Sequence, residues 1–195
     1  MPYNPNIHHR RSVRLQGYDY SQAGAYFITI CCDDRKCLFG NIINGEMNLN
    51  DAGKIADECW IEIPKHFPNA VLHEYVVMPN HVHGIVELAD RNNVGAENFL
   101  PLQNDTGIPV GVQNFEPLHP KQNAFQKMIP RSIGSIVKGF KIGVTIRAKQ
   151  FLPDIKIWQR NYHEHIIRNE QSYLTISEYI INNPKNWKDD KFYYQ

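Results

Sequence analysis

The sequence predicts an α+β fold in which helices pack on one face of an antiparallel sheet. Stretches rich in aromatic and β-branched residues alternate with amphipathic stretches along the chain. Asn44-Gly45 and Pro79-Asn80 each separate two strand-like stretches, as tight turns between antiparallel strands do. The 195 residues show no internal repeat and no second domain. We therefore expect residues 1–195 to form a single domain.

Five or more strands are expected. Residues 25–32 (AYFITICC) read as a buried strand, and residues 38–49 contain a hairpin, because Asn44 and Gly45 tolerate the positive φ of a type I′ turn. Residues 71–78 and 81–88 form an antiparallel pair across Pro79-Asn80. Residues 155–158 and 165–168 are short strand candidates.

Three helices are expected, each opening at a capping residue or a first-turn proline. They run over residues 51–66 after Asn50, from Pro130 to about residue 150, and from Asn169 to near Asn183, where Pro184 cannot continue the helix. Residues 90–127 are rich in Asn, Gly, Pro and Gln without a period, which predicts a mobile surface insertion. Residues 185–195 are expected to form a C-terminal tail.

Composition narrows the class of protein. No apolar run approaches the roughly 18 residues of a membrane span, and the polar N-terminus lacks the apolar core of a signal peptide. The cysteines form no C-x-x-C pair, so the sequence does not indicate a zinc ribbon. We expect a cytoplasmic, nucleoid-associated protein with no membrane partner, although a net charge of only +1 argues weakly against nucleic acid.

The pair His81 and His83 is the sharpest local feature. Residues two apart in a strand point to the same face, so the two imidazoles would lie side by side as half of a metal site. The alternative is two ordinary histidines on the polar face of an amphipathic strand. His163 and His165 have the same spacing but lack the tight turn that would fix their position.

The last helix offers a partner for the histidines. Tyr179 and Asn183 are four residues apart, so they share a helical face at the edge of the buried stripe. A half-buried phenol there can keep its hydroxyl exposed. The alternative is that Tyr179 only packs and that Asn183 only ends the helix before Pro184.

Together the two pairs suggest phosphoryl chemistry. A tyrosine hydroxyl has a pKa of ~10, so forming phenolate at neutral pH costs about 4 kcal/mol. A divalent ion beside a phosphate offsets such a cost by stabilising charge in the transition state. Attack by the phenol would give a phosphotyrosine and would conserve the bond energy for rejoining strands.

An ordered set of motifs extends over nearly the whole chain. They are residues 26–29 (YFIT), 38–40 (LFG), 77–84 (VMPNHVHG), 140–141 (FK), 157–162 (IWQRNY), 164–169 (EHIIRN) and 179–184 (YIINNP). With this set the chain resembles the REP-associated tyrosine transposases, which are related to the small single-tyrosine insertion-sequence transposases of the HUH type. The one departure is the long insertion.

The resemblance implies a ferredoxin-like or RRM-like core and a metal-dependent transposase. Tyr179 would be the nucleophile, His81 and His83 the histidine metal motif, and Asn183 the third ligand. Mg²⁺ or Mn²⁺ is implied, although imidazole suits softer ions. The implied substrate is hairpin-flanked single-stranded DNA, cut and rejoined through a 5′-phosphotyrosine, in an enzyme that resembles dimeric relatives and is a possible homodimer.

Basic and aromatic side chains are candidates for DNA contact, by phosphate neutralisation or base stacking. They are Arg10, Arg11, Arg14, Arg131, Lys138, Lys141, Lys149, Trp158, Arg160, Tyr162 and His165. Tyr18 is a further stacking candidate. The alternative for the lysines is a solvated helix flank.

Two other functions stay open. One is a domesticated binder of palindromic DNA hairpins that no longer cuts. The other is a small metal-dependent phosphoesterase, although Ile85 stands where histidine-triad hydrolases need a further alternating histidine.

Overall fold

The computed structural model describes residues 18–89 and 129–193, which form a four-stranded antiparallel sheet with helices on it. The spatial order of the strands is β4-β5-β1-β6. Their bounds are Gly24–Cys31 (β1), Ala70–Met78 (β4), His81–Leu88 (β5) and His163–Ile167 (β6). Along the chain these strands alternate with helices as β1-α1-β4-β5-α3-β6, the split βαβ arrangement of ferredoxin-like folds. The predicted α+β class is confirmed.

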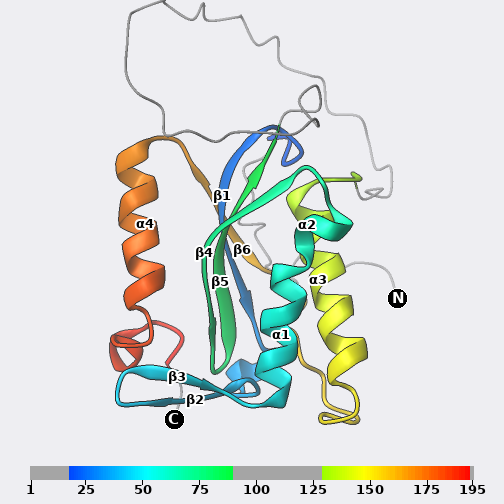
Figure 1. The fold of residues 1–195 in the computed structure, drawn as a ribbon, viewed down its shortest axis with the longest axis vertical. Coiled ribbons are helices and arrows are strands. Elements are labelled where there is room, and N and C mark those ends of the chain that lie inside the picture. Colours follow the sequence, from blue (N-terminus) through cyan, green and yellow to red (C-terminus); the bar gives the residue numbers. More distant parts are fainter. Residues whose placement is uncertain (1–17, 90–128, 194–195) are drawn as a thin grey trace, which may run out of the picture.

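The helices lie on both faces of the sheet (Figure 1). Helices α1 (Asp51–Ile61) and α3 (Ile133–Ala148) pack together on one face. Helix α4 (Glu170–Asn182) lies on the opposite face, along β4. The prediction that helices share one face therefore holds for α1 and α3 but not for α4. The reason is that α4 follows the last strand of the core and has only the open face left to cover.

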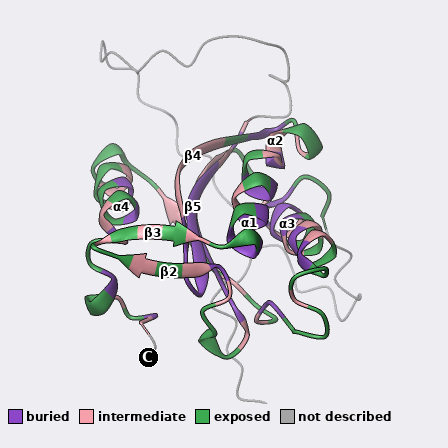
Figure 2. Cartoon of the chain, turned by 60° about the horizontal axis from the view of Figure 1, so that its bottom comes forward, coloured by how far each residue is buried: buried purple, intermediate pink, exposed green. Residues whose placement is uncertain are grey.

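The hydrophobic core lies between one face of the sheet and the pair of helices α1 and α3 (Figure 2). Trp60 of α1 is 1% exposed, and its indole packs edge-on against Phe140 of α3 at 5.3 Å between ring centroids. The indole also lies directly on Gly84 of β5, where a Cβ atom would collide with it. Gly84 thus allows the close approach of α1 to the strand that carries both histidines.

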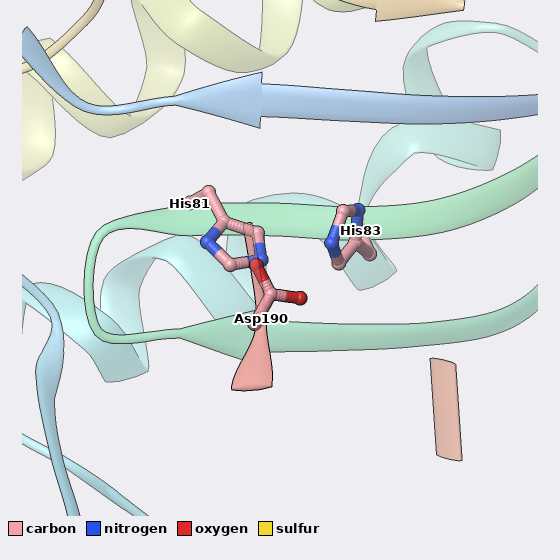
Figure 3. Close-up of side chains that lie close together, drawn as sticks. All are labelled: His81, His83 and Asp190. Carbon is pink, nitrogen blue, oxygen red and sulfur yellow. The ribbon is translucent and has the colours of Figure 1, made fainter. Parts of the chain in front are cut away.

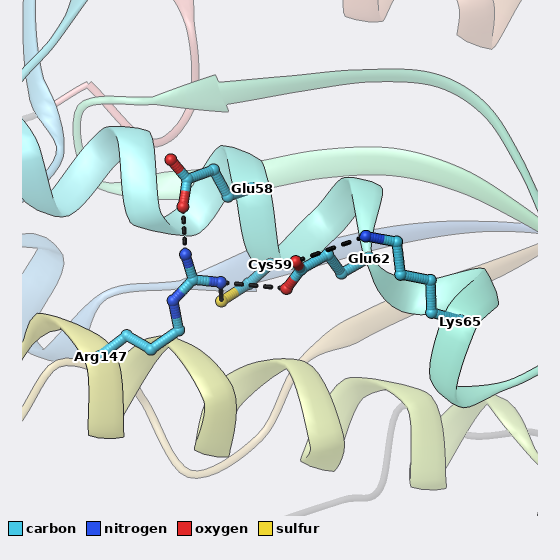
Figure 4. A network of polar contacts seen from close by, with 5 residues as sticks. All are labelled: Glu58, Cys59, Glu62, Lys65 and Arg147. Carbon is cyan, nitrogen blue, oxygen red and sulfur yellow. Dashed lines mark hydrogen bonds and ion pairs between the residues drawn. The ribbon is translucent and has the colours of Figure 1, made fainter.

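A polar network joins α1 to α3 at the surface (Figure 4). Arg147 donates to the carboxylates of Glu58 and Glu62, the latter at 3.0 Å, and to the sulfur of Cys59 at 3.6 Å. Lys65 pairs with the same Glu62 at 3.6 Å. Networks of this kind contribute more than isolated surface pairs.

The hairpin β2 (Gly40–Ile43) and β3 (Glu46–Leu49) forms a separate two-stranded sheet at one end of the molecule (Figure 1). Asn44 and Gly45 have φ of 53° and 79°, which confirms the predicted turn with two positive φ angles. The hairpin leads into α1, whose cap Asn50 accepts from the amide of Gly53 at 2.9 Å.

The predicted helix over residues 51–66 is in fact two helices, α1 and the short α2 (Ile63–His66). Pro64 has no N–H to donate to the carbonyl of residue 60, so the first helix ends before it.

The predicted start of α3 at Pro130 is also wrong. Arg131 has a φ of 61°, which a helix cannot contain, and the side chain of Ser132 caps the helix instead.

Residues 155–158 do not form the predicted strand. They contribute one isolated bridge, between Trp158 and Cys32, because β1 has already ended at Cys31. Strand β6 starts two residues before its predicted position and so includes His163 as well as His165.

The C-terminal segment is more than a tail. It contains a short 3-10 helix, η2 (Trp187–Asp189), and it returns to the sheet face under α4, where Phe192 is 5% exposed. Another short 3-10 helix, η1 (Asp33–Arg35), follows β1. The expected insertion at 90–127 lies outside the described residues, as do residues 194–195. Within the described residues, no helix has the length and apolar character needed to cross a membrane.

Candidate active site

His81 and His83 lie side by side on β5, on the face that α4 covers. Both side chains are fully buried, and their ring centroids are 4.3 Å apart. Val82 between them points into the core on the other face. This is the arrangement that strand alternation predicts for a His-x-His pair. Burial lowers the pKa of both imidazoles well below the ordinary value of 6.5, so both rings are neutral and each keeps a lone pair.

Asn80 fixes the tautomer of His81. Its Oδ1 lies 2.8 Å from Nδ1 of His81, and its Nδ2 donates to the carbonyl oxygens of Arg35 and Phe192 at 3.1 and 2.9 Å. Because the amide orientation is set by these two carbonyls, Oδ1 is the acceptor and Nδ1 of His81 carries the proton. The lone pair of His81 is therefore on Nε2, the usual choice for a metal-binding histidine with a hydrogen-bonded Nδ1.

His83 is held at both ring nitrogens. Nδ1 lies 2.8 Å from the hydroxyl of Thr29 on β1, and Nε2 lies 3.2 Å from the hydroxyl of Tyr179 on α4. A threonine hydroxyl can donate or accept, so Thr29 is compatible with either tautomer of His83. When Nδ1 donates to Thr29, Nε2 presents its lone pair towards Tyr179.

Tyr179 is half-buried, with 39% of its surface exposed, and its ring packs edge-on against Phe27 and His83. Its hydroxyl donates to Oδ2 of Asp190 at 2.8 Å. Burial and this hydrogen bond to a carboxylate raise the pKa of Tyr179 above its ordinary value of 10. The phenol is thus protonated at neutral pH.

Asp190 is the residue that sequence reasoning missed. Burial alone would raise its pKa, but hydrogen bonds from the Phe192 amide and from the side chains of Asn183 and Tyr179 lower it overall, so Asp190 is an anion. One ligand atom each from His81, His83 and Asp190 lie within 4.8 Å of one another (Figure 3). Asp190 lies in an irregular segment with no period or motif, so no sequence signal singled it out.

Two buried polar atoms at this site have no hydrogen-bond partner among the described residues. They are Nε2 of His81 and Oδ1 of Asn183, whose Nδ2 donates to Asp190 at 2.7 Å. An unpaired buried polar atom costs about 1–3 kcal/mol, so two at one place need an explanation. Two imidazole lone pairs, a carboxylate and an amide oxygen are all metal-ligand types, and the donor set fits a divalent cation.

A second polar network holds α4 against β4. Tyr173 of α4 donates to Glu74 at 2.8 Å and lies 3.1 Å from Nδ1 of His73, whose Nε2 meets Glu87 of β5 at 2.8 Å. Ser177 of α4 also donates to Glu74, at 3.1 Å. The strand register shifts between Leu72 and Tyr75, which allows the adjacent residues His73 and Glu74 both to reach α4. This network sets the position of Tyr179 over the histidines.

The basic residues of α3 do not lie beside this cluster. Lys138 and Lys149 are exposed on the helix that covers the other face of the sheet, and Arg131 is exposed in the turn before it. Lys141 donates to the carbonyl oxygens of Gln159 and Asn161 at 2.7 and 3.0 Å. Its ammonium group therefore connects two segments of this chain.

The aromatic candidates differ in accessibility. Trp158 is 8% exposed and packs between Phe39 and Phe140, so its faces are not free to stack on a base. Tyr18 and Tyr162 pack against the core, half-buried. Arg160 is exposed, while Arg10, Arg11 and Arg14 lie outside the described residues.

The second histidine pair lies on the same sheet face as the first. His163 and His165 on β6 pair with Thr29 and Phe27 of β1, and both are exposed. Neither belongs to the cluster of possible ligands that contains His81 and His83.

Comparisons with known proteins agree with this architecture. No protein-family model matches the chain. Over 192 residues the chain is 48% identical to an uncharacterized protein of Haemophilus influenzae, an alignment that covers 98% of this chain and 97% of the relative. Among solved structures, a REP-associated tyrosine transposase bound to a REP hairpin is similar with a TM-score of 0.54 and 19% identity, over 92% of this chain and 77% of that one. The chain therefore belongs to one family with the Haemophilus influenzae protein, and it has the fold of the REP-associated tyrosine transposase.

Proposed function

We propose that the protein is a metal-dependent DNA transposase, a single-strand endonuclease that cuts and rejoins hairpin-flanked single-stranded DNA through a 5′-phosphotyrosine. The observation that carries the proposal is the position of the Tyr179 hydroxyl, 3.2 Å from Nε2 of His83 and 2.8 Å from Asp190. A packing role alone would not account for a hydroxyl that contacts two of the three residues that could hold a cation.

His81, His83 and Asp190 would hold the metal, with Asn183 as a fourth candidate through Oδ1. When bound, the cation supplies Lewis-acid stabilisation of the charge that develops on the phosphate. The mixture of imidazole and carboxylate ligands suits Mn²⁺, and Mg²⁺ is the other candidate. The two unpaired buried atoms support this assignment because a ligated metal would satisfy them.

The proposed chemical step is one substitution at phosphorus. The oxygen of Tyr179 forms a bond to the phosphate, the bond from phosphorus to the 3′ oxygen breaks, and the 3′ oxygen leaves and takes a proton from water to become a 3′ hydroxyl. The proton of the phenol has an acceptor in place, because Tyr179 already donates to Asp190. The raised pKa of Tyr179 means that the proton must leave as the bond forms, not before. Rejoining is the same reaction reversed with another 3′ hydroxyl.

The shared fold supports the proposed substrate class. The similar solved structure is described as bound to a REP hairpin, and we extend hairpin DNA to this chain as its proposed substrate. All the site residues come from one chain, so one protomer would contain a complete site. The proposal includes a homodimer in which each protomer has its own site, because the chemistry needs no second chain.

A labelled hairpin with single-stranded flanks, incubated with Mn²⁺ and separated on a denaturing gel, tests the proposal. We expect wild-type protein to give a shortened strand and a slower protein-linked band. Tyr179→Phe should abolish both products while keeping affinity for the DNA, because it removes one oxygen from a half-exposed ring. His81→Ala with His83→Ala should also end cleavage.

The two rival functions give different results in the same assay. Binding without any cleaved product from the wild-type protein would indicate a non-cleaving hairpin binder. Repeated turnover of a nucleotide substrate without a protein-linked band would indicate a phosphoesterase. Cleavage by Tyr179→Phe at the wild-type rate would remove the tyrosine from the mechanism.

A further inference from the structure

A groove lies between the β2–β3 hairpin and the C-terminal segment that follows α4. Its volume is about 720 Å³, within the roughly 300–1,000 Å³ typical of small-molecule sites. Residues from Cys37 to Gly45 form one wall, and residues from Pro184 to Tyr193 form the other. The hairpin and this segment lie next to each other at the end of the sheet (Figure 2).

The lining combines cationic and aromatic groups. Lys185 and Lys188 are exposed, and neither forms an ion pair with any of the residues that the structure describes. Asp189 is the single carboxylate in the lining, so the groove has a positive balance. Trp187 and Tyr193 pack edge-on at 5.4 Å between centroids and both line the groove. Lysines for phosphate and an aromatic surface for a base are the two elements of single-strand binding sites.

The groove lies beside the candidate active site. Trp187 lines the groove and its indole lies 6.0 Å from the ring of His81, between centroids. Pro79, also in the lining, is two residues before His81 in the turn that precedes β5. Asp189 precedes Asp190 directly. The groove is thus adjacent to Asp190, which accepts the hydrogen bond of Tyr179.

We propose that the groove binds a nucleotide of the single-stranded DNA next to the phosphate that Tyr179 attacks. Lys185 and Lys188 would contact its phosphates, while Tyr193 would contact its base. This inference rests on the proposed function and adds a binding subsite to it. The subsite would help to explain how a protein with a net charge of only +1 holds a single strand, because two of its lysines without an ion pair among the described residues lie together beside the site.

The test measures DNA binding in the Tyr179→Phe background, where the strand stays intact. Two labelled DNAs are compared by fluorescence anisotropy, a hairpin with a short single-stranded extension and the same hairpin without it. The test variant is Lys185→Ala with Lys188→Ala. The control variant is Lys54→Ala with Lys65→Ala, which also removes two exposed charges, from α1 and α2 on the far face.

We expect the Lys185 and Lys188 double variant to bind the extended hairpin roughly tenfold more weakly and to lower its salt-dependence slope by about 1.4, since each lysine–phosphate contact on a single strand contributes about 0.7. Its affinity for the hairpin without the extension should stay unchanged, and the control variant should match the parent on both DNAs.

Equal affinity of parent and test variant for the extended hairpin would overturn the subsite. An equal loss on both DNAs would overturn it as well, because the lysines would then contact the duplex. If wild-type protein still forms the covalent product in either case, the proposed function survives without the subsite. A parent protein that binds neither DNA would overturn both.

Discussion

At the residue scale, the site depends on which ring nitrogen of each histidine is free. Asn80 sets this for His81, because its amide is locked by the carbonyl oxygens of Arg35 and Phe192 and can offer only Oδ1 to the ring. Asn80 is 1% exposed, so its side chain has no alternative partner in solvent. In the proposed function it is a positioning residue, which would act on the metal through His81.

Asn80→Ala should therefore weaken Mn²⁺ binding by about 10- to 100-fold, the usual effect of losing an outer hydrogen bond to a ligating histidine. Isothermal titration with Mn²⁺ measures this directly. Asn182→Ala, which removes an exposed amide bonded only to the carbonyl of Glu178 in α4, is the matched control and should leave the affinity unchanged. Wild-type affinity in a folded Asn80→Ala protein would show that the tautomer is not set by this residue.

Gly84 gives a second residue-scale prediction. A Cβ atom there would collide with the indole of Trp60, so Gly84→Ala should lower the free energy of unfolding by about 1–3 kcal/mol through overpacking. Denaturant titration gives the value. Gly143→Ala is the control: its new Cβ would meet only the sulfur of Cys59 at 3.5 Å, and removing a helical glycine should stabilise by about 0.5–1 kcal/mol. Loss of stability in the control alone would contradict this packing account.

Sequence reasoning succeeded at the residue scale where a local rule fixes the outcome. Strand alternation placed His81 and His83 on one face, and helical spacing placed Tyr179 and Asn183 together. It failed for Asp190 and Trp158. Asp190 approaches the histidines only because the segment after Pro184 folds back, and Trp158 is covered by Phe39 and Phe140 from distant elements. Neither fact has a local signature.

At the element scale, the position of α4 decides where the phenol lies. The helix contacts the sheet mainly along β4, through Tyr173 and Ser177 to Glu74 and His73. The hydrogen bond to Glu87 raises the pKa of His73, burial opposes this, and the nearby carboxylates raise it further, so the net shift is upward. Folding therefore shifts His73 towards its protonated form relative to the unfolded protein.

This shift predicts a pH-dependent stability. A group whose pKa is raised on folding contributes its full stabilisation below the unfolded pKa of 6.5 and loses it as pH rises through the folded pKa. The difference in unfolding free energy between wild type and His73→Gln should thus be larger near pH 5.5 than near pH 8. Chemical denaturation at the two pH values measures it, and a difference that grows with pH would refute the role of His73.

Some element boundaries were predictable from a local rule, and others depended on the rest of the fold. The caps Asn50 and Asn169 were predictable because capping is local, and both side chains accept the expected amide hydrogen bonds. The start of α3 was not predictable. Pro130 is by itself a good first-turn residue, and only the positive φ of Arg131 prevents the helix from starting there. The face on which α4 packs depends on the finished sheet.

At the whole-molecule scale, the fold separates structural and chemical roles onto two faces of one sheet. One face carries α1, α3 and the hydrophobic core, and the other carries α4, the histidines and the returning C-terminal segment. The lysines of α3 lie on the structural face, whereas Lys185 and Lys188 lie at the end of the sheet beside the site. The order of strands and helices along the chain followed from the sequence pattern and the ferredoxin-like core from the family resemblance, but this separation followed from neither.

Because Tyr179 and His83 meet within one chain, active sites should not be shared between protomers. A mixture of Tyr179→Phe protein with the His81→Ala, His83→Ala double variant should remain inactive, because each chain lacks one half of its own site. Cleavage is measured after the two proteins are mixed and incubated together before DNA is added. Recovery of about a quarter or more of wild-type activity would contradict assembly within one chain.

The most direct test of the central claim identifies the atom that becomes linked to DNA. After reaction with a hairpin-flanked strand and Mn²⁺, the protein is digested with protease and nuclease, and the modified peptide is sequenced by mass spectrometry. The account predicts a nucleotide joined through its 5′ phosphate to Tyr179 and no adduct in the Tyr179→Phe protein. An adduct on another residue, or cleavage with no adduct on any residue, would contradict it.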